Sequence, residues 1–122
     1  MSTLIVDVVA RGKNPNTFIL VIVEQGPWAE SSVAANMARL QDRLYDCVDA
    51  TIDGQVSEKF SESSGTKIIV RLDGYNLPQE QVQDFFARFS KGVQSAPDYV
   101  QAIAESRHVT SIDFELDLRE LP

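Results

Sequence analysis

The hydrophobic pattern of the first half of the chain predicts two strands followed by a long helix. Residues 3–10 and 17–24 are rich in Val, Ile and Leu, as strands are, and the turn-forming residues 12–16 join them as a hairpin. The second strand is apolar at nearly every position, which is typical of a strand covered on both faces. Between residues 31 and 52, apolar side chains recur every three or four positions, which predicts a helix with one buried stripe. This apolar stripe consists of Val33, Met37, Leu40, Leu44 and Val48.

After Gly54, which accepts the left-handed conformation that ends a helix, the pattern predicts a second hairpin. Residues 55–60 form its first strand, which is weakly apolar and therefore expected at an edge of the sheet. A polar turn at residues 61–65 leads to its second strand at residues 66–72.

The last third of the chain predicts two helices and a final strand. Residues 76–79 are typical of a helix start, and residues 95–98 give a similar signal for a short helix that ends near residue 106. Residues 112–119 alternate apolar and charged side chains, which predicts a strand with one buried face. The buried face of the first of these helices consists of Val82, Phe85, Phe86, Phe89 and Val93.

The order of these elements predicts an α+β fold, in which an antiparallel sheet of about five strands carries helices on one face. Without the first strand, the order is the βαββαβ of the ferredoxin-like split βαβ fold, so the fold would be ferredoxin-like with an extra N-terminal strand. In a ferredoxin-like sheet the first core strand already has a neighbour on each side. The N-terminal hairpin partner must displace one of these neighbours, so the strand order stays open.

Composition adds limits on the partners. The 122 residues carry 11 basic and 18 acidic side chains, a formal net charge of −7 that is spread evenly along the chain. This length suits one domain, and we expect a single domain over residues 1–122. The acidic balance argues against nucleic acid and against anionic membranes as partners, since both bind clustered Lys and Arg. The start of the chain lacks the basic segment and long apolar run of a signal peptide, and no apolar run could span a bilayer.

Candidate catalytic residues are scarce. Cys47 is the only cysteine, and its place beside the apolar stripe indicates packing rather than a reactive thiol. His108 is the only histidine, and its position in a turn favours an exposed structural role over a metal-binding or catalytic one. Asp113, Glu115 and Asp117 could bind a hard cation, but the alternation of the last strand by itself predicts a solvated face. We therefore expect no cofactor and no metal, and nothing in the sequence indicates an enzyme.

Four aspartates on the long helix form the first feature that folding alone does not explain. They are spaced by four, three and four residues, which places them on one side of the helix, opposite the apolar stripe. Like charges at this spacing repel, and the helix dipole disfavours anions near the C-terminus. Arg39 and Arg43 are expected to relieve only part of this repulsion. We predict that this acidic stripe binds a basic partner; the alternative is an ordinary solvated face. Its residues are Asp42, Asp46, Asp49 and Asp53.

Apolar residues on the predicted outer face of the sheet form the second such feature. Monomers rarely leave a patch of this kind bare, and the simplest cover is a second copy of the chain, packed sheet against sheet. The alternative cover is the short helix at residues 97–106, which would lie across the same face. The residues of this predicted dimer patch are Ile5, Val9, Ile19, Val21 and Ile69.

Short motifs of structural residues run along nearly the whole chain. They are Val6-Asp7-Val8-Val9, Trp28 after a strand, Leu40-Gln41-Asp42-Arg43-Leu44, Ile52-Asp53-Gly54-Gln55-Val56, Gly65 before Ile68-Ile69-Val70, and Ile112-Asp113-Phe114-Glu115. In these motifs the chain resembles a family of small bacterial proteins known only as a domain of unknown function. The resemblance implies a bacterial, cytoplasmic protein, and it carries over no activity and no catalytic residue. The chain departs from the pattern by inserting the helix at residues 97–106.

These features together predict protein interaction as the function. We expect a non-enzymatic bacterial interaction domain, homodimeric, that binds a basic protein through the acidic stripe; an immunity or antitoxin-like role fits its size and charge. The alternative is a small-molecule binding module with a pocket between sheet and helices near Trp28, Tyr45 and Tyr75. A third hypothesis, an enzyme that works with carboxylates alone, requires two acids converging in one cleft.

Overall fold

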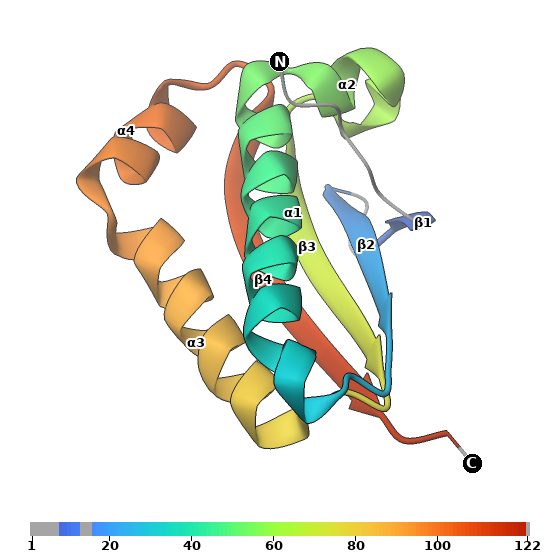
Figure 1. Cartoon of the computed structure of the whole chain (residues 1–122). Coiled ribbons are helices and arrows are strands. Elements are labelled where there is room, and N and C mark those ends of the chain that lie inside the picture. The colour runs from blue at the N-terminus through green and yellow to red at the C-terminus, as the bar shows by residue number, and fades with distance from the viewer. Residues whose placement is uncertain (1–7, 13–15, 122) are drawn as a thin grey trace.

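In the computed structural model, which describes residues 8–12 and 16–121, a four-stranded sheet packs against a layer of helices (Figure 1). The strands are β1 (Val8–Arg11), β2 (Thr17–Gln25), β3 (Thr66–Tyr75) and β4 (Val109–Arg119). The helices are α1 (Val33–Asp53), α2 (Gln55–Lys59), α3 (Gln79–Ser95) and α4 (Pro97–Glu105). Two short 3-10 turns lie at Glu30–Ser32 and Ser61–Ser63.

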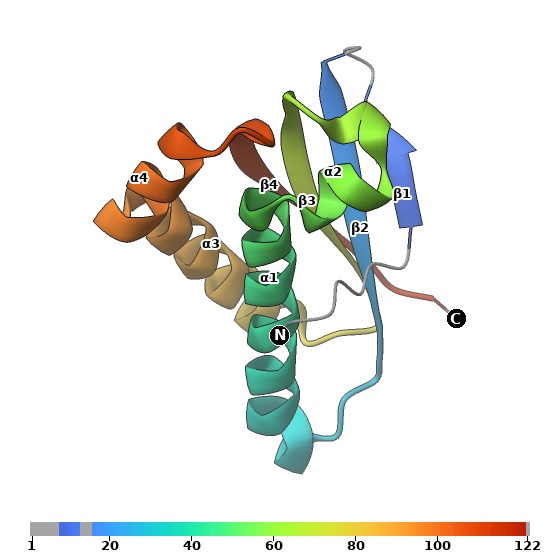
Figure 2. The same cartoon turned by 90° about the horizontal axis from the view of Figure 1, so that it is seen from above.

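The strands follow one another across the sheet in chain order, β1-β2-β3-β4. β1 pairs antiparallel with β2, whereas β2, β3 and β4 run parallel. Parallel neighbours need a long crossover connection, which α1 supplies between β2 and β3, and α3 with α4 between β3 and β4. Such crossovers are right-handed, and both step in the same direction, so their helices lie on the same face of the sheet. Figure 2 shows α1, α3 and α4 together on that face.

The prediction of an antiparallel, five-stranded, ferredoxin-like sheet is wrong. Residues 55–60 do not form an edge strand, because Gln55–Lys59 is the helix α2. Without that strand, α1 returns the chain to the end of the sheet where β2 begins, and β3 therefore runs parallel to β2. Among the described strands, antiparallel pairing is limited to the predicted N-terminal hairpin of β1 and β2.

Val56 and Phe60 explain why this segment is helical. They are four residues apart, the spacing of one helical face, and here that face turns inward. Val56 is fully buried, and the Phe60 ring lies 6.1 Å from the ring of Phe18 in β2. Gly54, with φ at 95°, ends α1 and lets the chain leave in a new direction. A helix of five residues is too short for its periodicity to be distinguished from a strand pattern.

The core lies between the sheet and the helix layer. Because the apolar sides of the helices face this core, their polar sides face away from the sheet. The apolar stripe of α1 packs inward through Leu40, Leu44 and Val48. On α3, Phe86 and Phe89 meet Phe114 of β4 edge to face, with ring centroids 6.3 and 5.4 Å apart. The fully buried residues of the core also include Leu20, Ile22, Ile68, Val70, Leu72, Val82 and Val93.

Candidate functional site

The C-terminal half of the acidic stripe, Asp49 and Asp53, lies where α4 approaches α1, and Asp42 and Asp46 do not line the hollow between these helices. Asp42, near the middle of α1, and Asp53, its last residue, are exposed, while Asp46 and Asp49 between them are partly buried. The stripe is therefore not a uniform solvated face, because Asp49 contacts a second helix.

Two hydrogen bonds attach α4 to the C-terminal half of α1. The Tyr99 hydroxyl donates to Asp49 Oδ1 at 3.0 Å. Ser106 Oγ, just past the end of α4, donates to the carbonyl oxygen of Ile52, also at 3.0 Å. The Tyr99 ring stacks on Tyr45 of α1, with centroids 6.1 Å apart and planes inclined by 22°. These contacts hold both ends of α4 beside the C-terminal half of α1.

A hollow of about 350 Å³ opens between α1 and α4 beside this contact. Its carboxylates come from both helices, and its apolar lining includes Ile52 and Ala102. Among the described residues, no three His, Cys, Asp or Glu side chains lie close enough together to hold a metal ion. The spread carboxylates suit a larger cation, such as an ammonium or guanidinium group on an aliphatic stem. The residues that line this acidic hollow are Asp49, Ile52, Asp53, Asp98, Tyr99 and Ala102.

The electrostatics of the acidic hollow favour a positive charge. Burial raises the pKa of Asp49 above its ordinary value, against the hydrogen bond from Tyr99, which lowers it. The charges of Asp53 and Asp46 raise the pKa of Asp49 further. Burial, together with the bond to Asp49, also raises the pKa of Tyr99, so its hydroxyl stays protonated and continues to donate. Among the described residues, no lysine or arginine forms an ion pair with an aspartate of the stripe.

The two arginines expected to relieve this repulsion instead bind Glu24, at an inward position near the end of β2. The Glu24 side chain is 5% exposed. Arg39 spans both of its carboxylate oxygens, at 2.7 and 2.9 Å. Arg43 Nη1 lies 2.7 Å from Glu24 Oε1 and 3.3 Å from the carbonyl oxygen of Val23. The partial relief of the stripe expected from these arginines is corrected accordingly: among the described residues, their ion pairs are with Glu24.

Sequence reasoning missed this cluster, although the chain carries signals for it. Glu24 is a charged residue at an inward position of a strand that is otherwise apolar there, and a buried charge requires a partner. Arg39 and Arg43 lie one helical turn apart and so face the same side of α1. Burial acts to raise the pKa of Glu24, but the hydrogen bonds and charges of the two arginines outweigh it and hold that pKa below its ordinary value.

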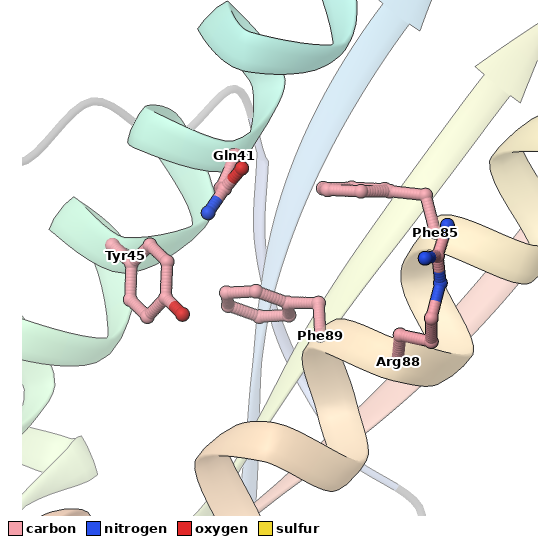
Figure 3. Close-up of a pocket in the computed structure, with 5 residues that line it drawn as sticks. All are labelled: Gln41, Tyr45, Phe85, Arg88 and Phe89. Atoms are coloured by element: carbon pink, nitrogen blue, oxygen red, sulfur yellow. The ribbon is translucent and has the colours of Figure 1, made fainter.

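A second hollow, of about 360 Å³, lies between α1 and α3 (Figure 3). Tyr45 and Phe89 meet there nearly edge to face, with ring centroids 4.9 Å apart, and Phe85 stacks on Phe89 at 6.3 Å. Arg88 at its rim is 75% exposed and pairs with Asp84 at 2.7 Å. The residues that line this aromatic hollow are Gln41, Tyr45, Phe85, Arg88 and Phe89.

The structure does not bring together the three residues of the predicted small-molecule pocket. Tyr45 lines the aromatic hollow on the helix side of the sheet. Tyr75 ends β3 and, by the alternation of that strand, faces the opposite side from the buried Gly74. Trp28 lies in the connection between β2 and α1, partly buried against the core.

The sequence profile of a family of unknown function (DUF6572) matches residues 1–105. The chain belongs to this family. No curated protein and no solved structure is significantly similar to it. None of the described helices is long and apolar enough to cross a membrane.

The family match includes both helices of the acidic hollow. It runs from the start of the chain to the last residue of α4, Glu105, so the helix interpreted as an insertion lies within the matched residues. The match ends before β4, so the motif at residues 112–115 lies outside it.

The reactive side chains of this family member are engaged in packing. Cys47 is buried, and burial raises the pKa of its thiol to about 12, which leaves almost no thiolate at neutral pH. His108 is partly buried rather than exposed, and its Nδ1 lies 3.1 Å from Ser57 Oγ. The same ring lies directly over Gly54. Cys47 is therefore part of the core, and His108, just before β4, packs against the end of α1 and the start of α2.

The outer face of the sheet carries the described part of the predicted dimer patch. Ile19 and Ile69 are register partners and are partly buried, and Val21 is 6% exposed. Ile5 and the side chain of Val9 lie outside the described residues. The alternative cover is wrong, because α4 lies with α1 and α3 on the other face (Figure 2).

The charged residues of β4 also point to the outer face, and they are largely paired. Lys67 binds Asp113 at 2.5 Å, and Arg71 binds Asp117 at 3.1 Å. Arg119 binds Asp117 as well, at 3.0 Å, while Glu115 is exposed.

Proposed function

We propose that this chain is a non-enzymatic interaction domain that binds a basic partner protein, and that a lysine or arginine of the partner enters the acidic hollow. The observation that carries the proposal is the convergence of Asp49 and Asp53 of α1 with Asp98 of α4 around one hollow. Their carboxylates would hold the cationic group, and Ile52 and Ala102 would contact its aliphatic stem.

The carboxylates of the acidic stripe destabilise the chain when no partner is bound, and this supports the proposal. The carboxylates of the stripe repel one another and lie near the C-terminal end of α1, where the helix dipole opposes them. The raised pKa of Asp49 has the same origin, since burial and neighbouring charges disfavour its ionised form. Residues that destabilise the free protein in this way are typical of binding surfaces.

A titration with a short arginine peptide tests the proposal. The probe is an acetylated and amidated peptide of alternating glycine and arginine, and its control is the same peptide with neutral citrulline in place of arginine. We expect the arginine peptide to shift the NMR signals of Ile52, Asp53 and Ala102, and the citrulline peptide to leave them unchanged. Shifts that cluster on the aromatic hollow instead, or no shifts at all, would contradict the proposal.

Charge removal should affect affinity and stability in opposite directions. The triple substitution Asp49→Asn, Asp53→Asn and Asp98→Asn should weaken arginine-peptide binding at least about tenfold. At neutral pH, Asp49→Asn and Asp53→Asn should each raise the free energy of unfolding by about 0.5 kcal/mol, because each removes like-charge repulsion. Because the pKa of Asp49 is raised on folding, the gain from Asp49→Asn should disappear as the pH falls below the ordinary aspartate value of 3.8.

The matched control is Asp84→Asn, which removes an exposed carboxylate of α3 outside the acidic hollow. It should change neither the affinity for the peptide nor, beyond a few tenths of a kcal/mol, the stability. It removes one charge, whereas the triple substitution removes three. If it weakens binding by the same factor per charge removed, the effect is one of net charge, and the site is not the acidic hollow.

An immunity or antitoxin-like role is one form of this proposal. Its support is the small size of the chain and its net charge of −7, which complement a basic toxin. A basic toxin that loses its activity when the chain is added, and regains it with the triple asparagine variant, would establish this role.

Small-molecule binding is the second candidate, and the aromatic hollow is the observation in its favour (Figure 3). Three aromatic rings and the Gln41 amide line it, which suits a small planar ligand. This candidate replaces the predicted pocket, since Tyr45 lines the aromatic hollow and neither Trp28 nor Tyr75 does.

The homodimer remains part of the proposal, through the outer face of the sheet. We expect the chain to sediment as a dimer at micromolar concentration, and Ile69→Asp to yield a folded monomer because it places a charge inside the patch. Glu115→Gln, on the same face but outside the patch, should leave the dimer intact. A monomer for the unsubstituted chain at this concentration would refute the homodimer.

A further inference from the structure

β4 ends the described sheet, on the side opposite β1 (Figure 1). It has 11 residues, Val109–Arg119. An edge strand presents unpaired N–H and C=O groups, which makes it a template for a further strand. The residues of β4 whose backbone N–H and C=O groups face away from β3 follow from the hydrogen bonds between the two strands.

The direction of the backbone groups follows from one hydrogen bond at the end of β4. Asn76 N, just past β3, donates to the carbonyl oxygen of Arg119 at 2.9 Å, so the backbone of Arg119 faces β3. Backbone direction alternates along a strand, so Glu115 and Asp117 also face β3. Phe114, Leu116 and Leu118 therefore direct their N–H and C=O groups away from β3. We call these three residues the free edge.

The side chains of the free edge are also incompletely covered. Phe114, Leu116 and Leu118 point to the helix layer but are only partly buried. Val70 and Leu72, the register partners of Phe114 and Leu116 in β3, are by contrast fully buried. The difference arises because β3 has a strand on each side, whereas β4 has one on a single side. A further strand would cover these side chains if its own helix-facing residues were apolar.

The other face of β4 determines the charge of the incoming strand. Its carboxylates are Asp113, Glu115 and Asp117, and residues directly opposite on a neighbouring strand interact most strongly when their charges are opposite. Lys67, Arg71 and Arg119 already pair with Asp113 and Asp117, while Glu115 remains exposed. We propose that the free edge of β4 binds an extended segment of a partner protein in which apolar residues alternate with basic ones.

A second copy of β4 fits this edge less well. In any antiparallel register centred on residues 114 to 116, at least two carboxylates of one copy lie opposite carboxylates of the other. Like charges directly opposite each other destabilise a strand pair. The charge pattern therefore favours a different, basic chain over self-association.

Hydrogen exchange with a designed peptide tests this proposal. The probe is an octapeptide of alternating valine and lysine, and its control has the same composition in an order that does not alternate. At a saturating concentration of the probe, the Leu116 and Leu118 amides should exchange at least tenfold more slowly. The Glu115 and Asp117 amides, which already face β3, serve as internal controls and should not change. The control peptide should slow none of them.

Two variants separate this site from the acidic hollow. Glu115→Lys places a like charge opposite the lysines of the probe and should weaken its binding about fivefold. The triple variant Asp49→Asn, Asp53→Asn and Asp98→Asn should bind the probe unchanged, which keeps the outcome independent of the proposed function. The proposal is overturned if the probe does not bind, if it binds without slowing Leu116 and Leu118, or if these amides slow with the concentration of the chain alone.

Discussion

Replacement of Gly54 by alanine is expected to lower the free energy of unfolding by about 2–4 kcal/mol. Gly54 has φ at 95°, a left-handed conformation that costs alanine about 1–2 kcal/mol. A Cβ atom there would also lie 2.6 Å from His108 Nε2. The ring cannot simply swing away, because its Nδ1 is held 3.1 Å from Ser57 Oγ. Urea unfolding of the two proteins measures the difference.

Two other glycines separate the backbone effect from the clash. Gly65 also has a positive φ, 73°, but its added Cβ would meet no atom within 4 Å, so Gly65→Ala should cost only the backbone part, about 1–2 kcal/mol. Gly92 is inside α3 with open space around it, and Gly92→Ala should stabilise the chain by about 0.5–1 kcal/mol. If Gly54→Ala and Gly65→Ala lowered the free energy of unfolding equally, the His108 ring would move away from the added Cβ atom at no free-energy cost.

Substitution of Glu24 by glutamine should cost about 2–3 kcal/mol at neutral pH. The change keeps the shape of the side chain but removes the charge that Arg39 and Arg43 share. The pKa of Glu24 is held below its ordinary value of 4.5, so its ionised form stabilises the folded state. This stability is fully present above the ordinary value and is lost as the pH falls through the lower pKa of the folded state. The unfolding free energies of the two proteins should therefore converge in acid.

The two arginines provide the controls for Glu24. The side chain of Arg43 is 20% exposed and that of Arg39 is 48% exposed, so Arg43→Gln should cost more than Arg39→Gln. If Glu24→Gln were neutral and showed no pH dependence relative to the unsubstituted chain, the ion pairs would contribute nothing to stability.

The long helix and its two faces were predictable because their cause is local. Apolar residues at helical spacing from Val33 to Val48 require one buried side, and the structure places α1 at Val33–Asp53. The same spacing places the aspartates on one side of α1. The N-terminal hairpin was predictable for a similar reason, since two β-rich segments flank a short turn.

The direction of β3 was not predictable from the segments taken one by one. It depends on whether residues 55–60 form a strand or a helix. The helix α2 has a buried face only because Val56 and Phe60 pack against the core. With a strand there, β3 would run antiparallel to its neighbour; with a helix, β3 runs parallel to β2. One misassigned segment therefore changes the sheet from parallel to antiparallel.

Some residues of the candidate site were likewise predictable from the sequence, and others were not. Spacing along the chain was enough to single out Asp49 and Asp53. The contribution of Asp98 and Tyr99 appears only when α4 packs on α1, about 50 residues further along the chain. The binding of Arg39 and Arg43 to Glu24 likewise joins residues on separate elements.

By itself, the sequence determined the helices of α1, α3 and α4, their apolar faces, and the row of carboxylates on α1, because each follows from contacts within a few turns of chain. Only the tertiary structure decided the parallel sheet, the acidic hollow, the free edge of β4 and the partner of Glu24. These depend on which surfaces meet across the core, and the burial of apolar area that selects those meetings acts between segments far apart in the chain.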